Sequence, residues 1–402
     1  MTRREKNHWR DLAVAGAMPR FREPLHVGLP NLPDRGNFHS RIDAALDRRR
    51  LTNDGPLVRE LETSLARHLR VRHCVVVANG TLALSLALRA AAVRGEVILP
   101  SFTFIATAHA VEWQNMTPVF CDVDPATHNI DPARIEERIT DRTSAILGVH
   151  VWGRPCAVDA IETIAKKRGL VVLYDAAHAF SCSTNGTMIG NFGAMEAFSF
   201  HATKFFHTLE GGAVTTNDNA LAATVRKMRD FGYDENDDVV TLGTNAKLNE
   251  IGAGMGLALL DDLDRILDVN RANYRAYERE LAGISGVRLI THNDTERSNY
   301  QYIVLEVDGS DAALDRDELL AVLKAENVLA RRYFDPPCHE CEPYRSRKEM
   351  ARGRLEHTDR LSRRLLCLPT GERVDDDTIR AIGGIVRTSM QHAGAIRKAL
   401  AR

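Results

Sequence analysis

The sequence predicts an α/β fold in which a large, mostly parallel sheet is followed by a smaller α+β domain. Apolar runs of strand length alternate with helical stretches along much of the 402-residue chain, as they do in parallel strands joined by helices. The runs at 74–78 and 170–174 are apolar at every position instead of at every second position. Strands of this kind are expected where helices cover both faces of a sheet.

The chain divides into three predicted parts. Residues 1–36 contain several prolines and no periodic pattern, so we expect an N-terminal arm. The large domain is expected over 37–255. The small domain is expected over 256–402, where the alternation changes, with one long helix over 254–284. The other expected elements are strands at 74–78, 96–100, 117–122, 144–150, 170–175, 195–200, 212–216 and 302–307, and helices at 37–50, 103–114, 157–168, 219–231 and 315–326.

Composition excludes several functional classes. Lysine and arginine number 53 and aspartate and glutamate 54, so no nucleic-acid-binding surface is predicted. No apolar run reaches the length of a membrane span, and no signal-peptide core follows the charged N-terminus. The seven cysteines are an odd number, which favours reduced thiols in a cytoplasm. The cluster Cys338–Cys341 has no second pair at zinc spacing, so no metal site is predicted.

Lys204 is the first candidate for chemistry, because it lies in the aromatic run Phe198–Phe206. Burial among aromatic rings lowers the pKa of a lysine by disfavouring the ammonium form. A partly neutral lysine is a nucleophile that can form a Schiff base. Taken alone, Lys204 is better explained as a lysine that extends from an apolar strand to solvent.

The run Cys74–Thr81 predicts a buried strand, a tight turn and a helix start. Gly80 and Thr81 fall at this start, where unpaired N–H groups and the helix dipole attract a phosphate group. An ordinary helix cap is the alternative.

Asp175 ends the apolar strand 170–175, at the sheet edge where open α/β proteins bind ligands. A buried carboxylate needs a positive partner, and a protonated pyridine ring is a suitable one. His178, three residues later, could reach the phenolic oxygen of pyridoxal phosphate (PLP). The alternatives are that Asp175 caps the next turn and that His178 is hydrogen-bonded within a loop.

The sequence thus contains, in this order, a candidate phosphate site at Gly80 and Thr81, a candidate carboxylate for a ring nitrogen at Asp175, and Lys204. Each lies at the end of a predicted strand. Here the sequence resembles the DegT/StrS-type sugar aminotransferases, which are PLP enzymes of fold type I. The resemblance runs from Leu51 to Gly371. Its most specific pieces are Pro100–Thr107, Asp122–Pro125, Asp175–His178, Ser199–Lys204 and Glu210–Gly212.

The resemblance implies roles for individual residues. Lys204 would bind PLP as a Schiff base and move the proton at the substrate's α-carbon. Ser199, Gly80 and Thr81 would bind the cofactor phosphate, and Phe104 would cover its ring.

Four further positions match the family outside the cofactor pocket. Asn245 would reach the phosphate of the neighbouring subunit, and Lys247 would lie near the same interface, so a homodimer with shared active sites is expected. Tyr333 and His339 match a loop that lies near the sugar nucleotide.

The implied reaction is transfer of an amino group from L-glutamate to a nucleotide-linked sugar. The Ser-Phe-His-x-Thr-Lys pattern resembles enzymes that act on dTDP-linked 4-keto-6-deoxy sugars. The alternatives are a 3-keto-sugar or keto-inositol aminotransferase and a PLP-binding regulatory or non-catalytic homologue. Sugar 3-dehydratases of this fold usually carry histidine where this chain has Lys204, which argues against a dehydratase.

Overall fold

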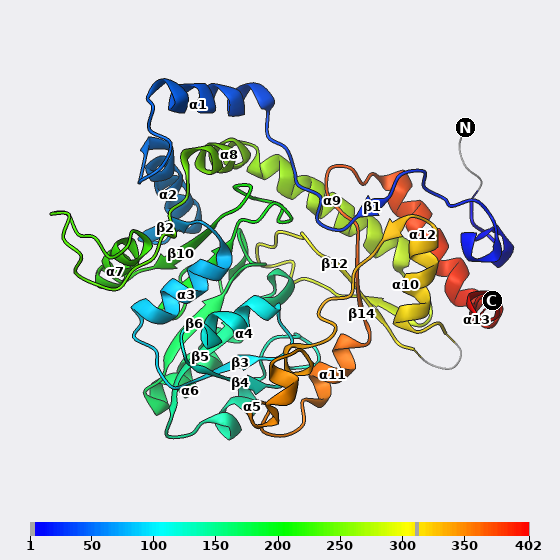
Figure 1. The fold of residues 1–402 in the computed structure, drawn as a ribbon. Helices are drawn as coiled ribbons and strands as arrows, with labels where there is room; N and C mark the ends of the chain where they lie inside the picture. The colour runs from blue at the N-terminus through cyan, green and yellow to red at the C-terminus, as the bar shows by residue number, and fades with distance from the viewer. Residues whose placement is uncertain (1–4, 310–312, 402) are drawn as a thin grey trace.

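A seven-stranded sheet forms the centre of the larger part of the molecule (Figure 1). The computed structural model describes residues 5–309 and 313–401. The strand order is β2-β10-β9-β6-β5-β3-β4; β10 is antiparallel to both neighbours, and the other pairs are parallel. The strands are β2 (His73–Val77), β3 (Glu96–Pro100), β4 (Thr117–Cys121), β5 (Thr143–Val149), β6 (Val171–Asp175), β9 (Met195–Ser199) and β10 (Gly212–Thr216). The predicted fold class is confirmed.

Helices cover both faces of this sheet, which explains the continuous apolar runs. In β2, Cys74 and Val76 pack with α2 (Pro56–Leu69) and α8 (Glu250–Asp261). Val75 and Val77 point to the other face and pack with α3 (Gly80–Ala90). The remaining helices around the sheet are α4 (Ile105–Glu112), α5 (Pro132–Ile135), α6 (Val158–Arg168) and α7 (Asn219–Arg229), and α1 (Arg35–Asp47) packs on α8.

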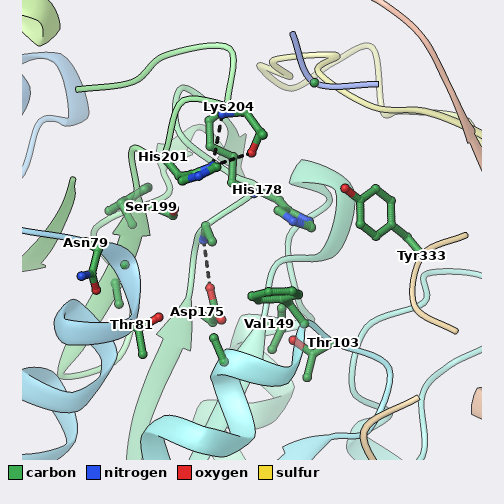
Figure 2. A pocket seen from close by; sticks show the side chains of 18 of the residues that line it. Asn79, Thr81, Thr103, Val149, Asp175, His178, Ser199, His201, Lys204 and Tyr333 are labelled. Carbon is green, nitrogen blue, oxygen red and sulfur yellow. Dashed lines mark hydrogen bonds between the residues drawn. The ribbon is translucent and has the colours of Figure 1, made fainter. Parts of the chain in front are cut away.

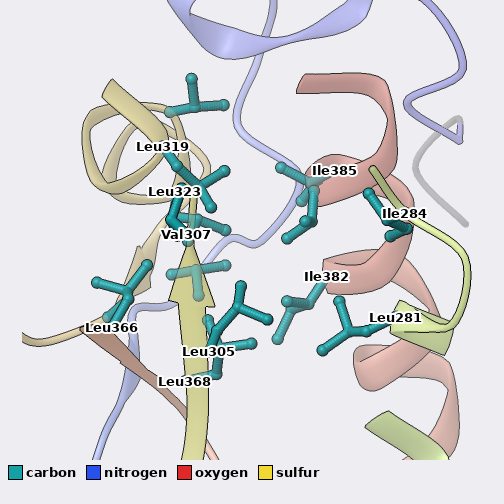
Figure 3. Close-up of a cluster of buried hydrophobic side chains, with 14 of the residues drawn as sticks. Leu281, Ile284, Leu305, Val307, Leu319, Leu323, Leu366, Leu368, Ile382 and Ile385 are labelled. Atoms are coloured by element: carbon teal, nitrogen blue, oxygen red, sulfur yellow. The ribbon is translucent and has the colours of Figure 1, made fainter. Parts of the chain in front are cut away.

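The C-terminal part is built on a three-stranded antiparallel sheet of β11 (Val287–Leu289), β12 (Ile303–Val307) and β14 (Leu365–Leu368). Leu305, Leu323 and Ile382 meet in its core, between the sheet and its helices (Figure 3). The helices are α9 (Leu263–Leu281), α10 (Arg316–Ala325), α12 (Asp376–Gln391) and α13 (Ala393–Leu400). The single helix predicted over 254–284 is wrong, because Asp262 ends α8 and separates it from α9.

The N-terminal arm is tied to the C-terminal part of the molecule. Its strand β1 (Leu25–His26) pairs in parallel with β13 (Val328–Leu329), and Leu12 is fully buried in the C-terminal core. The Glu326 carboxylate accepts the N–H group of Ala13 at 2.7 Å and lies 3.3 Å from the Lys6 amine. The arm is therefore ordered by burial and hydrogen bonds, although it is mostly irregular.

Residues 338–362 return to the edge of the large sheet. Asp122, just after β4, accepts the N–H and the hydroxyl of Thr358, which lies in α11 (Glu356–Ser362), at 2.8 Å each. The Cys338 N–H donates to the Ser101 carbonyl at 3.0 Å. The domain boundary predicted at residue 255 stays a prediction. Residues 338–362 follow that boundary in the sequence but pack against the large sheet that precedes it. Over the described residues, no helix combines the length and apolarity needed to cross a membrane, and all seven cysteines are free thiols.

Candidate active site

Several parallel strands of the large sheet end at one cavity of about 360 Å³ (Figure 2). β2 ends just before α3, β6 ends at Asp175, and β9 ends at Ser199. Gly212 of β10 pairs with both Val77 and Ser199, which brings the ends of β2 and β9 to either side of it. Eight of the predicted site residues line the cavity: Gly80, Thr81, Phe104, Asp175, His178, Ser199, Lys204 and Tyr333.

The start of α3 and Ser199 form one end of the cavity. The Asn79 side chain accepts the Leu82 N–H at 2.9 Å, which caps the helix. The N–H groups of the preceding residues, Gly80 and Thr81, have no partner within the helix. A Cβ atom on Gly80 would lie 2.8 Å from the Ser199 Cβ, so only glycine allows this approach. The result is a small site with a helix N-terminus and two hydroxyl groups, suited to an anion.

Asp175 lies at the base of the cavity, between this anion site and His178 (Figure 2). Oδ1 accepts the Ala177 N–H at 3.0 Å, and Oδ2 accepts the Thr107 hydroxyl at 2.8 Å. Burial raises the pKa of Asp175, while these hydrogen bonds and the charge of Lys204 oppose the rise. A cationic ring nitrogen in the cavity would favour the ionised form further.

Lys204 lies in the turn after β9, with its backbone N–H donating to the His201 carbonyl at 2.8 Å. Its amine donates to the Tyr302 hydroxyl at 3.0 Å. Burial lowers the pKa of Lys204 to about 8, although the Asp175 carboxylate acts in the opposite direction. A substantial share of the amine is therefore neutral near pH 8, as a nucleophile requires.

His178 presents one defined nitrogen to the cavity. The backbone N–H of Trp152 donates to Nδ1 of His178 at 3.3 Å, so Nδ1 carries no proton and Nε2–H is left as a donor. Burial, with the charge of Lys204, lowers the pKa of His178 well below its usual value, which keeps the ring neutral. The ring stacks on Trp152 with centroids 5.8 Å apart. A neutral donor of this kind suits an anionic oxygen on a bound ring.

Phe104 and Tyr333 both line the cavity. Phe104, at the start of α4, is 58% exposed, so it is not part of the helix core. Tyr333 accepts a hydrogen bond from Arg331 at 3.3 Å, and both residues line the cavity.

Three predicted residues lie outside this cavity in the single chain. Asn245 is exposed in a strand-like bridge with Asp230. Lys247 pairs with Asp230 and lies 4.5 Å from the centroid of the Phe231 ring. His339 contacts two residues that do not line the cavity: Nδ1 lies 2.7 Å from the Ser101 hydroxyl and Nε2 3.1 Å from an Asp359 oxygen.

The sequence reasoning missed several residues of the site, among them one that contacts Asp175, one that contacts Lys204 and two from the N-terminal arm. Thr107 holds Asp175, Tyr302 contacts Lys204, and Val27 and Gly28 of the arm form part of the wall. Thr107 falls within the motif Pro100–Thr107, four positions after Thr103, whose hydroxyl lies 2.8 Å from its own. Tyr302 and the arm carry no local signal, because they reach the site from distant parts of the chain.

A sequence model of the DegT/DnrJ/EryC1/StrS aminotransferase family matches residues 34–387. The chain belongs to this family. It is 36% identical over 365 residues to a dTDP-4-amino-4,6-dideoxy-D-glucose transaminase of Shigella dysenteriae, covering 91% of this chain and 99% of that protein. A protein of the same name from Escherichia coli is 33% identical, with 88% and 96% covered. The solved structure of DesI with its TDP-sugar product superposes with a TM-score of 0.94 at 44% identity, over 98% of this chain and all of that one.

DegT/DnrJ/EryC1/StrS aminotransferases are PLP enzymes, so the predicted activity class and cofactor are confirmed. The cavity fits that cofactor on its own chemistry. One end is an anion site that a Cβ atom on Gly80 would fill. The base holds a buried carboxylate for a cationic ring nitrogen, and the far side holds a buried amine with a lowered pKa for an aldehyde.

Proposed function

We propose that this chain transfers the amino group of L-glutamate to the C4 keto group of a dTDP-linked 4-keto-6-deoxy sugar, as a homodimer. The sugar is supported by the two transaminases that share its sequence over most of their length, and by DesI, whose structure contains a TDP-sugar product. The donor follows from the resemblance to the family.

The observation that carries a catalytic role is the buried Lys204 amine in the same cavity as Asp175. Burial keeps part of this amine neutral, which transfer of a proton at the substrate carbon requires in addition to binding of the aldehyde. The arrangement therefore favours an aminotransferase over a regulatory or non-catalytic homologue.

The site residues have different roles in the proposed reaction. Gly80, Thr81 and Ser199 would hold the phosphate of PLP, and Asp175 would face its ring nitrogen. PLP supplies an electron sink when it is bound. Lys204 would bind the aldehyde carbon and, once released, move the proton at the substrate carbon. His178 would donate to the phenolic oxygen, and Phe104 would cover the ring.

The homodimer is supported by an apolar surface beside the cavity. Trp113 is 82% exposed and Leu242 65% exposed, and both line a groove with Phe104 between α3, α4 and residues 242–244. The green loop that follows α7 stands out from the body of the molecule (Figure 1) and exposes further apolar side chains, namely Phe231, Tyr233, Val239 and Val240. Water contact with so much apolar surface is unfavourable, and a second copy would cover it.

Asn245 and Lys247 follow this exposed loop in the sequence, so a second copy that covered the loop would lie close to them. In a two-fold dimer the same patch serves both chains. The resemblance to the family implies that each Asn245 would then reach the partner's anion site. A site shared in this way would bind PLP weakly in a monomer.

The test is transamination with purified protein and PLP. The enzyme is given L-glutamate and, separately, a dTDP-4-keto-6-deoxy sugar, a GDP-linked 4-keto-6-deoxy sugar, a UDP-linked 3-keto sugar and a keto-inositol. We expect the amino product from the dTDP-linked 4-keto sugar, identified by NMR, and none from the Lys204→Ala variant. Faster amination of the 3-keto sugar or the inositol would support those alternatives. Bound PLP whose visible absorbance ignores every amino donor would favour the regulatory homologue.

A further inference from the structure

The Lys204 amine has one side-chain hydrogen-bond partner within the described residues, the Tyr302 hydroxyl at 3.0 Å. Tyr302 directly precedes β12, so this partner belongs to the C-terminal sheet, whereas Lys204 follows β9 of the large sheet. The contact therefore joins the two sheets across the cavity.

The ring of Tyr302 is held by aromatic neighbours on several sides. Its centroid lies 4.5 Å from that of His178, 5.4 Å from that of Trp152 and 6.2 Å from that of Tyr333. Such packing fixes where the hydroxyl points. Burial raises the pKa of Tyr302 well above its usual value, so the phenol keeps its proton at neutral pH.

The backbone before Tyr302 is fastened to the loops that carry the site. The Gln301 side chain donates to the His178 carbonyl at 3.0 Å and accepts the Phe205 N–H at 3.4 Å. Asn299 donates to the carbonyls of His178 and Phe180 at 2.8 and 3.0 Å. Gln301 thus bridges the loop after β6 and the residue after Lys204, which sets the distance between the two hydrogen-bonded groups.

We infer that Tyr302 is a positioning residue that holds the free Lys204 amine over the cavity whenever the lysine is not bonded to the cofactor. In an aminotransferase the lysine is released during each half-reaction, and it must then stay close to the substrate carbon to move a proton there. A flexible four-carbon side chain has many alternative rotamers, and small misplacements of a reacting group cost large factors in rate.

Tyr302→Phe tests this, because phenylalanine keeps the ring and removes only the hydroxyl. Tyr300→Phe is the matched control. Tyr300 lies two residues away on the same segment, is 4% exposed, and packs on Tyr274 and His292.

The first measurement uses cofactor-free protein. Competitive acetylation of lysines across pH, read by peptide mass spectrometry, gives the titration midpoint of Lys204. A hydrogen bond from the ammonium form is charge-assisted and stronger than one from the neutral amine. We expect the midpoint in Tyr302→Phe to fall below that of the wild type, and Tyr300→Phe to leave it unchanged.

The second measurement is the half-reaction with L-glutamate, followed by the absorbance of the cofactor in a stopped-flow instrument. We expect the rate constant per bound cofactor to fall roughly 10- to 100-fold in Tyr302→Phe. The inference is overturned if the titration midpoint of Lys204 or the rate constant of the half-reaction is the same in Tyr302→Phe as in the Tyr300→Phe control. It is also overturned if the rate falls only in proportion to the loss of bound PLP. Neither measurement uses a sugar, so a wrong sugar assignment leaves this test intact, and a wrong donor is already visible in the wild type.

Discussion

The Thr107 hydroxyl, in the first turn of α4, donates a 2.8 Å hydrogen bond to Asp175 Oδ2. The other oxygen, Oδ1, accepts the N–H of Ala177. Burial raises the pKa of Asp175, and these donors, together with the charge of Lys204, favour the ionised carboxylate before any cationic ring arrives. The contact also ties the helix that carries Phe104 to the strand that carries Asp175.

Thr107→Val removes this donor at nearly constant size. We expect the pKa of Asp175 to rise further, so that activity is lost at a higher pH when the solution is made acidic. The measurement is the pH profile of the L-glutamate half-reaction, with Thr163→Val on the exposed face of α6 as the control. If the activity of Thr107→Val falls at the same acidic pH as that of the wild type, Thr107 does not stabilise the ionised form of Asp175.

Asp175→Asn keeps the shape of the side chain but removes its charge. We expect the rate to fall about 100-fold or more, as is typical when a charged contact to the reacting system is removed. PLP should still bind through its phosphate, which equilibrium dialysis can measure. An unchanged rate would contradict the role of Asp175.

Lys204→Met should abolish turnover and make the cofactor-free protein more stable. Burial lowers the pKa of Lys204 to about 8. Below pH 8 the folded protein therefore holds an ammonium that the unfolded chain solvates better, at a cost of about 3 kcal/mol. The cost shrinks as the pH rises from about 8 towards 10.4 and vanishes when both states are neutral.

Urea unfolding at pH 7 and pH 10 measures this difference. The gain of Lys204→Met over the wild type should be present at pH 7 and mostly lost at pH 10. Lys166→Met, on the exposed side of α6, should show no such gain. A gain independent of pH would mean that added apolar packing, and not the buried charge, stabilises the variant.

Asn245 can be tested by mixing chains. Neither Lys204→Ala nor Asn245→Ala homodimers should have a full site. If Asn245 reaches the cavity of the partner subunit, a heterodimer of the two variants has one site in which Lys204 and Asn245 are both intact. Random pairing should then restore about a quarter of wild-type activity. Activity no greater than that of the Asn245→Ala homodimers would place Asn245 outside a shared site.

Glu326→Ala should release the N-terminal arm. The side chains of Lys6 and Glu326 are 7% and 0% exposed, so removing the carboxylate leaves a buried ammonium without its partner. Loss of one member of a buried pair typically costs about 3–5 kcal/mol. Chemical unfolding should show this loss, and trypsin should cut the arm faster. Because Val27 and Gly28 line the cavity, we also expect a higher KM.

Local pattern predicted the large sheet well, because a strand buried on both faces is visible as a continuous apolar run. The run at 96–100 coincides with β3, and that at 74–78 differs from β2 by one residue at each end. The break at Asp262 was missed because the apolar positions of α8 and α9 continue through it. The arm was predicted as irregular because its buried residues, such as Leu12, have no regular spacing.

The candidate site could be predicted where it follows from topology. Parallel strands end at one edge, so Asp175 and Lys204 were expected to meet, and both line the cavity. The contact between Lys204 and Tyr302 could not be predicted, because it depends on how two sheets pack. The contact of His339 with Ser101 could not be predicted either, since the orientation of a side chain after a proline-rich turn is set by its neighbours. The place of His339 near the sugar nucleotide stays a prediction.

The placement of β10 between β2 and β9 has a consequence for biosynthesis. β2 joins the sheet only through β10, the last of its seven strands to leave the ribosome. Until β10 emerges, the turn at Gly80 cannot pack beside Ser199. The nascent chain therefore lacks the site that binds the phosphate of PLP. Cofactor loading therefore waits until more than half of the polypeptide has been translated.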